Sequence, residues 1–287
     1  MNLNTILQDA TQNYWSTGHF NVSNMEQLRA IVSAAEELKT PIMIGLSEGE
    51  RNFFGLKQAV EMVKVFEEEY STPIFLNPDH SYSVESAKEA FDAGFNSVHI
   101  DLSKLSLEEN IKGTKEVVDY VKSKNSDVSV EGELGYLRGK SEVQKEVIEI
   151  KEEDLTKPEE AAEFVEKTGI DRFSGAYGNI HGIAVNEPKI DIERIKEIRK
   201  ILPGNVSLVL HGGSGISEED MKKAIGAGIA NIHVNTDIRV AYTDALRRSL
   251  EDNPEQKTPY KIFPPVIEAV QKVVLEKLRL FGSVNKI

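Results

Sequence analysis

The sequence predicts a single (β/α)8 barrel of the α/β class, and three observations lead to this fold. Eight short apolar or β-branched runs recur along the chain, at residues 18–21, 41–46, 73–77, 97–101, 128–134, 171–176, 206–211 and 230–235. Stretches of helical periodicity lie between them, and this alternation is typical of a parallel sheet covered by helices. Eight repeats within about 250 residues favour a closed barrel over an open, doubly wound sheet.

The helices expected between the strands follow from the spacing of apolar residues. They cover 24–39, 56–69, 84–93, 107–124, 158–167, 192–201 and 218–227, and a final helix at about 264–281 forms a C-terminal extension. No linker rich in proline, glycine or serine divides the chain, so residues 1–287 are expected to form one domain. The long irregular segment at about 135–157 follows the fifth strand and is expected to be an active-site flap.

Composition excludes several classes of function. The 47 acidic and 34 basic residues give a net charge of −13 without a basic stripe, so nucleic acid is not an expected partner. The absence of cysteine removes disulfides, thiolate nucleophiles and cysteine-bound zinc, which leaves histidine and carboxylate as the strong metal ligands. The N-terminal residues lack the features of a signal peptide, and no apolar run reaches membrane length. We therefore expect a cytoplasmic protein with no membrane partner.

Histidines follow the predicted strands at equivalent places. His80 comes after the third strand, His181 after the sixth, and His211 ends the seventh, each beside a glycine or an aspartate. A single histidine is more often a core or surface residue than a ligand. In a barrel, however, the carboxyl ends of the strands meet at one face, so three such residues favour a catalytic metal site with an open position.

A second cluster indicates a phosphate site. Glycines and Ser214 occupy residues 212–215, where the seventh strand turns and where barrels commonly bind phosphate through backbone N–H groups. Glycine is also the usual turn residue, so this cluster alone is a weak signal. Asn235 and Thr236, at the end of the eighth strand, complete one cup around a phosphate.

Carboxylates beside these residues leave two alternatives open. Asp79 adjoins His80, so a neighbouring cation would keep it ionised and able to exchange protons with a substrate hydroxyl; alternatively, it orients a histidine. Glu133 shares a strand face with Glu131 and either binds or supports the metal, or forms a buried ion pair. None of the eight strand runs contains lysine, which argues against a catalytic lysine that forms a Schiff base.

Over nearly its whole length the chain resembles the class II fructose-bisphosphate and tagatose-bisphosphate aldolases. The similarity is carried, in matching order and spacing, by FNVSN at 20–24, PDHS at 78–81, SVHIDLS at 97–103, VEGELG at 130–135, GAYGNIHGI at 175–183, LVLHGGSGI at 208–216, VNTDIR at 234–239 and FGS at 281–283. The LHGGSG motif together with GNxHG is a specific pair.

The resemblance implies roles for individual residues. His80, His181 and His211 would bind Zn²⁺ or another divalent metal, with Glu133 as a further ligand, and a monovalent cation is a further cofactor to consider. Asp79 would be the acid/base that serves the hydroxyl beside the breaking carbon–carbon bond. The substrate and its phosphate would contact a larger set: Asn21, Ser47, Asp101, Gly182, Gly212, Gly213, Ser214, His233, Asn235 and Thr236.

Four departures from the family pattern bear on the substrate. His233 stands where the family usually carries asparagine. The flap lacks the Gly-Gly motif and its acidic pair, so Glu142 is the nearest candidate for the catalytic flap acid. Thr258-Pro259-Tyr260 replaces Asp-Pro-Arg, and Pro264 stands near the position of a basic residue that helps to hold the distal phosphate. Either Arg51, Arg138, Lys140 or a neighbouring subunit supplies that charge, or the aldehyde partner is not the usual triose phosphate. Lastly, Pro78 precedes the Asp-His pair.

The expected activity is metal-dependent, reversible cleavage of fructose 1,6-bisphosphate to dihydroxyacetone phosphate and glyceraldehyde 3-phosphate. The alternatives are a related aldolase for tagatose 1,6-bisphosphate, another phosphorylated ketose or a deoxy-sugar acid, and a homologue that binds metal and phosphate without turnover. A metal-dependent hydrolase is disfavoured, because such sites often use a His-x-His pair on the first strand and His19 has no such partner. The resemblance also implies a homo-oligomer, a dimer or tetramer.

Overall fold

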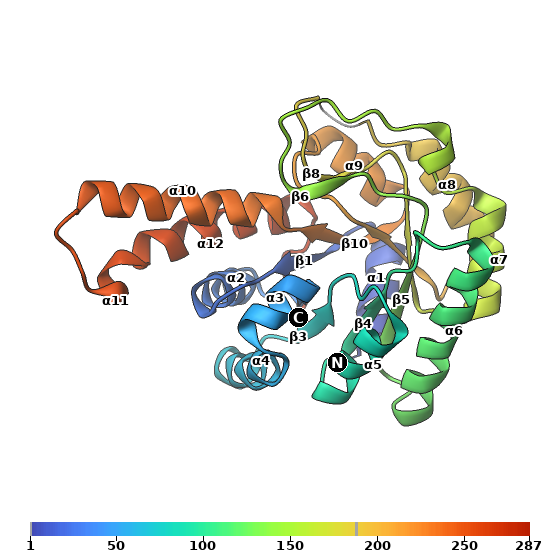
Figure 1. Cartoon of the computed structure of the whole chain (residues 1–287), viewed down its shortest axis with the longest axis horizontal. Coiled ribbons are helices and arrows are strands. Elements are labelled where there is room, and N and C mark those ends of the chain that lie inside the picture. Colours follow the sequence, from blue (N-terminus) through green and yellow to red (C-terminus); the bar gives the residue numbers. More distant parts are fainter. Residues whose placement is uncertain (1, 187–188) are drawn as a thin grey trace.

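Eight parallel strands form a barrel in the computed structural model, which describes residues 2–186 and 189–287. In sheet order they are β3 (Ile74–Pro78), β2 (Ile42–Leu46), β1 (Thr17–Asn21), β10 (Ile229–Val234), β9 (Ser207–Leu210), β7 (Arg172–Gly175), β5 (Ser129–Leu134) and β4 (Ser97–Ile100). Helices surround the strands (Figure 1). The predicted (β/α)8 barrel is therefore confirmed.

The barrel closes between β3 and β4 through individual contacts. Ser81 forms a parallel bridge with Ile100, and its carbonyl accepts a hydrogen bond of 2.9 Å from the Asp101 N–H. Lower in the seam, the Ser97 hydroxyl donates to Asn77 Oδ1 at 2.8 Å. This seam fixes the chain just after β3, the place where the sequence puts the Asp-His pair.

Seven helices cover the outside of the barrel where the sequence predicts them. They are α2 (Met25–Leu38), α4 (Leu56–Tyr70), α5 (Val84–Ala93), α6 (Leu107–Lys124), α7 (Pro158–Thr168), α8 (Ile192–Ile201) and α9 (Glu218–Gly226). Asn24, Ser106 and Ser217 each begin a helix by accepting a hydrogen bond from a backbone N–H of its first turn. The buried face of each helix packs against the strands in one large apolar core.

In the described part of the chain, four further α-helices lie outside those expected from periodicity. α1 (Leu3–Asn13) packs Leu3, Ile6 and Leu7 against Phe75 and Ala230 at the base of the barrel, and α3 (Glu48–Phe54) follows β2. α10 (Thr236–Asp252) follows β10. It runs beside the predicted final helix, α12 (Pro264–Leu280), and the two extend from the barrel as an arm with α11 (Pro259–Ile262) at its tip (Figure 1). α12 also packs against α2, and its Val270, Val274 and Leu278 belong to the main apolar core. Among the described residues, no helix is long and apolar enough to cross a bilayer.

The segment at 135–157 contains more regular structure than expected. β6 (Gly139–Val143) pairs with β8 (His181–Ile183), and a short 3-10 helix spans Glu152–Asp154. Because β8 carries His181, the segment is tied directly to a predicted metal ligand.

Candidate active site

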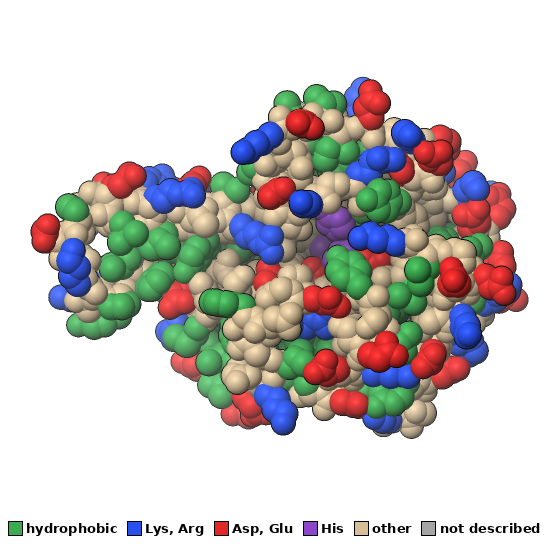
Figure 2. Space-filling model, viewed as in Figure 1, with side chains coloured by type: hydrophobic (Ala, Val, Ile, Leu, Met, Phe, Trp, Pro, Cys, Tyr) green, Lys and Arg blue, Asp and Glu red, His purple; other side chains and the backbone are tan. Residues whose placement is uncertain are grey.

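All six histidines of the chain meet inside the barrel near the carboxyl ends of the strands. Figure 2 shows some of them at the bottom of a hollow in this face of the molecule. Five are buried and His181 is half-buried: the set is His19, His80, His99, His181, His211 and His233. Bulky aliphatic side chains normally fill the interior of such a barrel. A concentration of imidazoles there indicates chemistry rather than packing.

His80 lies at the centre of the predicted metal site. Its backbone is left-handed, with φ 50°, a conformation that non-glycine residues seldom adopt and that clusters at functional sites. Its Nδ1 lies 2.8 Å from Asp101 Oδ2, and its Nε2 lies 3.1 Å from His181 Nε2. Burial would lower the pKa of His80, but the charges of Asp79 and Glu133 and the hydrogen bond to Asp101 raise it to about 9.

His181 and His211 approach His80 from β8 and from the end of β9. The His211 Nε2 bonds to Glu131 Oε1 at 2.8 Å, which leaves Nδ1 as its second nitrogen. The ring centroid of His80 lies 4.6 Å from that of His211 and 4.9 Å from that of His181, whereas His181 and His211 are 6.2 Å apart. His80 therefore lies between the other two predicted ligands, His181 and His211.

The donors at this site fit a divalent metal that prefers nitrogen ligands. Burial, with the charges of His80 and His211, lowers the pKa of His181 to about 3, so this imidazole is neutral at pH 7 and keeps a lone pair. His80 and His211 each turn one ring nitrogen to a carboxylate, the arrangement that orients histidine ligands in metal sites. The chemistry of the donors thus fits a divalent metal held by three histidines.

The two glutamates of β5, Glu131 and Glu133, have different partners. Glu131 forms the buried ion pair, with its Oε2 2.6 Å from Arg172 Nη1. Glu133 Oε2 lies 3.4 Å from His99 Nε2 and 3.6 Å from His80 Nδ1, and it has no hydrogen-bond partner among the described residues. Glu133 is thus beside His80 but is not the glutamate that pairs with arginine.

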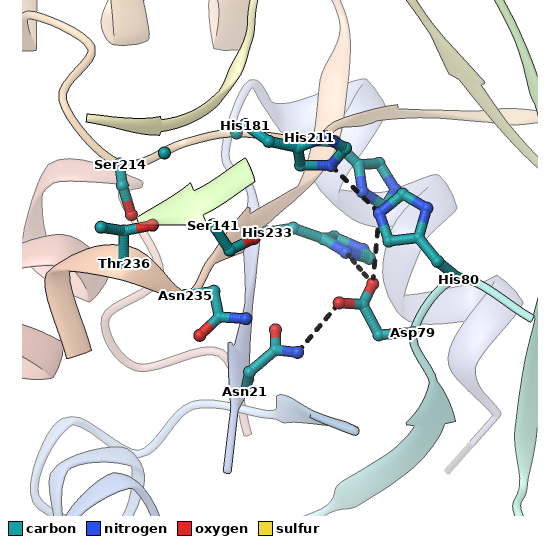
Figure 3. Close-up of a pocket in the computed structure, with 12 residues that line it drawn as sticks. Asn21, Asp79, His80, Ser141, His181, His211, Ser214, His233, Asn235 and Thr236 are labelled. Carbon is teal, nitrogen blue, oxygen red and sulfur yellow. Dashed lines mark hydrogen bonds and ion pairs between the residues drawn. The ribbon is translucent and has the colours of Figure 1, made fainter. Parts of the chain in front are cut away.

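Asp79 is held from two sides at the pocket (Figure 3). Asn21 Nδ2 donates to its Oδ2 at 2.9 Å, and the His233 Nδ1 lies 3.2 Å from its Oδ1. Burial would raise the pKa of Asp79, but the charge of His80 and the hydrogen bond to His233 hold it well below the usual range. The carboxylate is therefore ionised at neutral pH.

The predicted phosphate cup lies on the other side of the pocket. Gly182, Gly212, Ser214, Asn235 and Thr236 line the same cavity as Asp79 and the three histidines. Thr236 begins α10, and Asn235 caps it without a side-chain hydrogen bond. The Asp237 N–H donates to Ser214 Oγ at 3.1 Å, and the other N–H groups at the start of the helix are available to an anion. Gly212 has φ 66°, and a methyl group there would overlap the Ile180 carbonyl.

Some predicted contacts lie elsewhere. The Gly213 N–H donates to the His233 carbonyl at 2.8 Å. Ser47 caps α3 and bonds to Glu50. Asp101 supports His80, as described above. Glu142 is exposed on β6, whereas its neighbour Ser141 lines the pocket.

The two arginines expected to reach a distal phosphate have other partners. Arg51 is buried and donates to the Ser81 hydroxyl at 3.3 Å. Arg138 donates from Nε and Nη2 to the two carboxylate oxygens of Asp154, at 2.6 and 2.8 Å. Arg51 thus supports the loop after β3, and Arg138 anchors the segment at 135–157.

An arginine that sequence analysis did not single out connects this segment to the barrel. Arg239, on α10, donates to the Ser141 carbonyl at 2.8 Å and to Glu50 Oε1 at 2.7 Å. Glu50 Oε2 accepts from Asn21 Nδ2, the same nitrogen that bonds to Asp79. The position of the segment at 135–157 and the position of Asp79 therefore depend on one chain of hydrogen bonds.

Other residues of the site also went unpredicted, among them His99 and Arg172. A sequence signal for them exists, since β1, β4 and β5 carry polar residues at every second position, as in Ser97, His99 and Asp101. Side chains two apart point to one face of a strand, so this pattern marks a polar barrel interior.

Comparison with known proteins agrees with this geometry. The family described as "Fructose-bisphosphate aldolase class-II" matches residues 1–286. Fructose-bisphosphate aldolases of Geobacillus stearothermophilus and Staphylococcus aureus (strain Mu50) are each 38% identical over 100% of this chain and 98% of their own length. The crystal structure of the YdjI aldolase from Escherichia coli K12 superposes with a TM-score of 0.84 at 34% identity, covering 98% of this chain and 97% of that one.

Proposed function

The chain belongs to the class II fructose-bisphosphate aldolase family, and we propose that it reversibly cleaves fructose 1,6-bisphosphate into dihydroxyacetone phosphate and glyceraldehyde 3-phosphate. The observation that carries this proposal is the meeting of three histidines, one ionised aspartate and a phosphate cup in a single pocket. Each of the three parts matches one demand of aldol cleavage: charge stabilisation, proton transfer and substrate binding.

The metal requirement of the family is assigned here to His80, His181 and His211, with Zn²⁺ as the proposed ion. When bound, the ion supplies a Lewis acid for the negative charge that develops on the ketose oxygens during cleavage. Asp101 and Glu131 keep the rings of His80 and His211 oriented toward the ion. Glu133, beside His80, is proposed as a further ligand.

Asp79 is the proposed proton acceptor. Cleavage requires removal of the proton from the hydroxyl on the carbon that becomes the aldehyde, and Asp79 faces the pocket as a carboxylate. Its two oxygens are held by Asn21 and His233, so the position of the carboxylate is set before substrate binds.

The phosphate of the dihydroxyacetone part is proposed to bind at the N-terminus of α10. Backbone N–H groups there and the hydroxyls of Ser214 and Thr236 face the cavity. Lys277 pairs with Asp237 at 2.7 Å and so offsets the one acidic charge in the first turn of the helix.

The segment at 135–157 is proposed to act as a flap, with Glu142 as its acid. Ser141 already lines the pocket, and Glu142 follows it on β6. Successive side chains of a strand point to opposite faces, so Glu142 would replace Ser141 at the pocket through a one-residue change in the register of β6 against β8.

A second candidate substrate is a phosphorylated ketose with a less charged distal end, such as an analogue of tagatose 1,6-bisphosphate that carries only the first phosphate. The observation that favours it is the engagement of Arg51 with Ser81 and of Arg138 with Asp154. The binding affinity of such a ketose would fall little in the absence of a cation at the distal end of the site, because the ketose has no distal phosphate to bind there.

A homo-oligomer is also proposed. The arm formed by α10, α11 and α12 exposes Leu250 and Tyr260, and apolar side chains gather along it in Figure 2. Sedimentation velocity on the purified chain tests this, and a single monomeric species at micromolar concentration would contradict it.

The activity is tested by release of dihydroxyacetone phosphate from fructose 1,6-bisphosphate, tagatose 1,6-bisphosphate and fructose 1-phosphate. We expect the highest kcat/KM with fructose 1,6-bisphosphate. Equal values for fructose 1,6-bisphosphate and fructose 1-phosphate would favour the second candidate, and turnover of none of the three would indicate a homologue that only binds.

A further inference from the structure

His19 and His233 form a stacked pair at the pocket, which His233 lines, and the His233 ring lies 3.9 Å from that of His211 between centroids. The ring centroids of His19 and His233 are 3.5 Å apart and their planes differ by 5°. The two residues are register partners on the neighbouring strands β1 and β10, and both are buried. Parallel rings at this distance cannot both direct a ring nitrogen at one ion, because imidazole binds metals in the plane of the ring.

Both nitrogens of His233 face oxygen atoms of the protein. Nδ1 lies 3.2 Å from Asp79 Oδ1, and Nε2 lies 3.0 Å from Asn231 Oδ1. Burial and the charges of His19 and His211 hold the pKa of His233 well below its usual value, so the ring is neutral and has one N–H to donate. We assign this N–H to Nδ1, because a carboxylate is a stronger acceptor than an amide oxygen.

His19 is held by its own neighbours. Asn77 Oδ1 accepts from Ser97 Oγ at 2.8 Å and from Arg172 Nη2 at 3.2 Å, so the Asn77 amide nitrogen faces the His19 Nε2 at 3.1 Å. On β2, Gly45 leaves the space that the ring occupies, since a methyl group at Gly45 would overlap the imidazole of His19.

We propose that His233 is a positioning residue for Asp79 and that His19 holds His233 in place by stacking. The proposal rests on the role of Asp79 as proton acceptor in the proposed function. His233 and Asn21 bind different oxygens of the carboxylate, so together they oppose its rotation about the side-chain bond. The identity of residue 233 then acts on the rate of proton transfer rather than on substrate affinity.

The test uses the zinc-loaded enzyme and fructose 1,6-bisphosphate. His233→Leu removes both ring nitrogens but keeps bulk, and we expect kcat to fall by roughly 10- to 100-fold with KM changed less than about twofold. His233→Asn, whose amide nitrogen reaches the place of Nδ1, should recover most of the lost kcat. Bound zinc, measured by elemental analysis, should equal that of the wild type in both variants.

A double-mutant cycle separates positioning from direct substrate contact. If His233 acts through Asp79, His233→Leu should add little to the effect of Asp79→Asn. An equal loss of kcat in both backgrounds, a rise in KM alone, or loss of zinc would overturn the proposal. Full activity of the Asp79→Asn single variant would instead show that the acid/base assignment in the proposed function is wrong.

Substitution of His19, the stacking partner of His233, provides an independent test. His19→Phe keeps a flat ring against His233, whereas His19→Ala removes it, so kcat should fall with alanine and recover with phenylalanine. Equal kcat in the two variants would contradict the role given to His19. Thermal unfolding of each variant checks that the barrel remains folded.

Discussion

The Nε2 atoms of His80 and His181 lie 3.1 Å apart, with the other nitrogen of His80 bonded to Asp101. Two imidazole nitrogens that both carry lone pairs repel at this distance unless a proton or a cation lies between them. The pair thus joins the loop after β3 to β8 at the point where the three proposed ligands meet, and the first predictions concern its metal.

Replacing any one of the three ligands should remove zinc and activity together. His80→Ala, His181→Ala and His211→Ala each leave two histidines, too few for the usual three-ligand catalytic site. Elemental analysis and cleavage rates measured on the same preparations check this. The surface variant Lys64→Ala, from an exposed ion pair, is the control and should retain both. A histidine variant with full zinc and full activity would exclude that residue as a ligand.

Zinc affinity should increase with pH. Burial would lower the pKa of His80, but Asp79, Glu133 and Asp101 raise it to about 9, so below that pH zinc must displace a proton. The apparent affinity should rise by about tenfold per pH unit between roughly pH 7 and 9. Competition with a chromophoric chelator measures it, and an affinity independent of pH would contradict the assignment.

The same shift has the opposite effect on the stability of chelator-treated protein. A folded-state pKa of about 9 lies above the ordinary value of 6.5, so protonated His80 stabilises the fold fully below pH 6.5. That contribution is lost as the pH rises through about 9. Urea unfolding across this pH range should show a decline in the free energy of unfolding of the wild type, and this decline should be absent in His80→Gln.

Asp79→Asn should separate binding from chemistry. The amide cannot accept the substrate proton, so kcat should fall by roughly 10²–10⁴ while zinc content is retained. Single-turnover cleavage and zinc analysis check both halves. Normal turnover would mean that Asp79 only orients its neighbours.

Arg138→Ala should affect fructose 1,6-bisphosphate and fructose 1-phosphate alike. Arg138 bonds to Asp154 through two nitrogens, so its loss should loosen the flap rather than remove a phosphate contact. The kcat/KM ratio of the two substrates measures this, with Arg247→Ala on the arm as the control. A loss confined to fructose 1,6-bisphosphate would restore Arg138 as a phosphate ligand.

Much of the fold follows from sequence pattern, and the exceptions have physical reasons. The eight strands were predictable because each is a short apolar run at the right spacing. α10 was missed because few of its residues are buried, so its apolar periodicity is weak. β6 was missed because its residues are exposed or half-buried and pair only with a short strand.

Some residues of the site could likewise be predicted from the sequence, and others could not. His80, His181 and His211 could be predicted because strand ends in a barrel share one face. The contacts of His233 could not, because its partners Asp79 and Asn231 depend on rotamers and on register between strands. The partner of Arg138 is Asp154, and no local pattern links the two.

The rate of fructose 1,6-bisphosphate cleavage with and without metal is the most direct test of the proposed metal-dependent mechanism. Rates are recorded for the purified chain, after dialysis against a chelator, and after return of zinc. We predict loss of activity on chelation and its recovery with zinc, with no effect of borohydride in the presence of substrate. Full activity of the metal-stripped protein, or inactivation by borohydride, would contradict a class II mechanism and indicate a Schiff base.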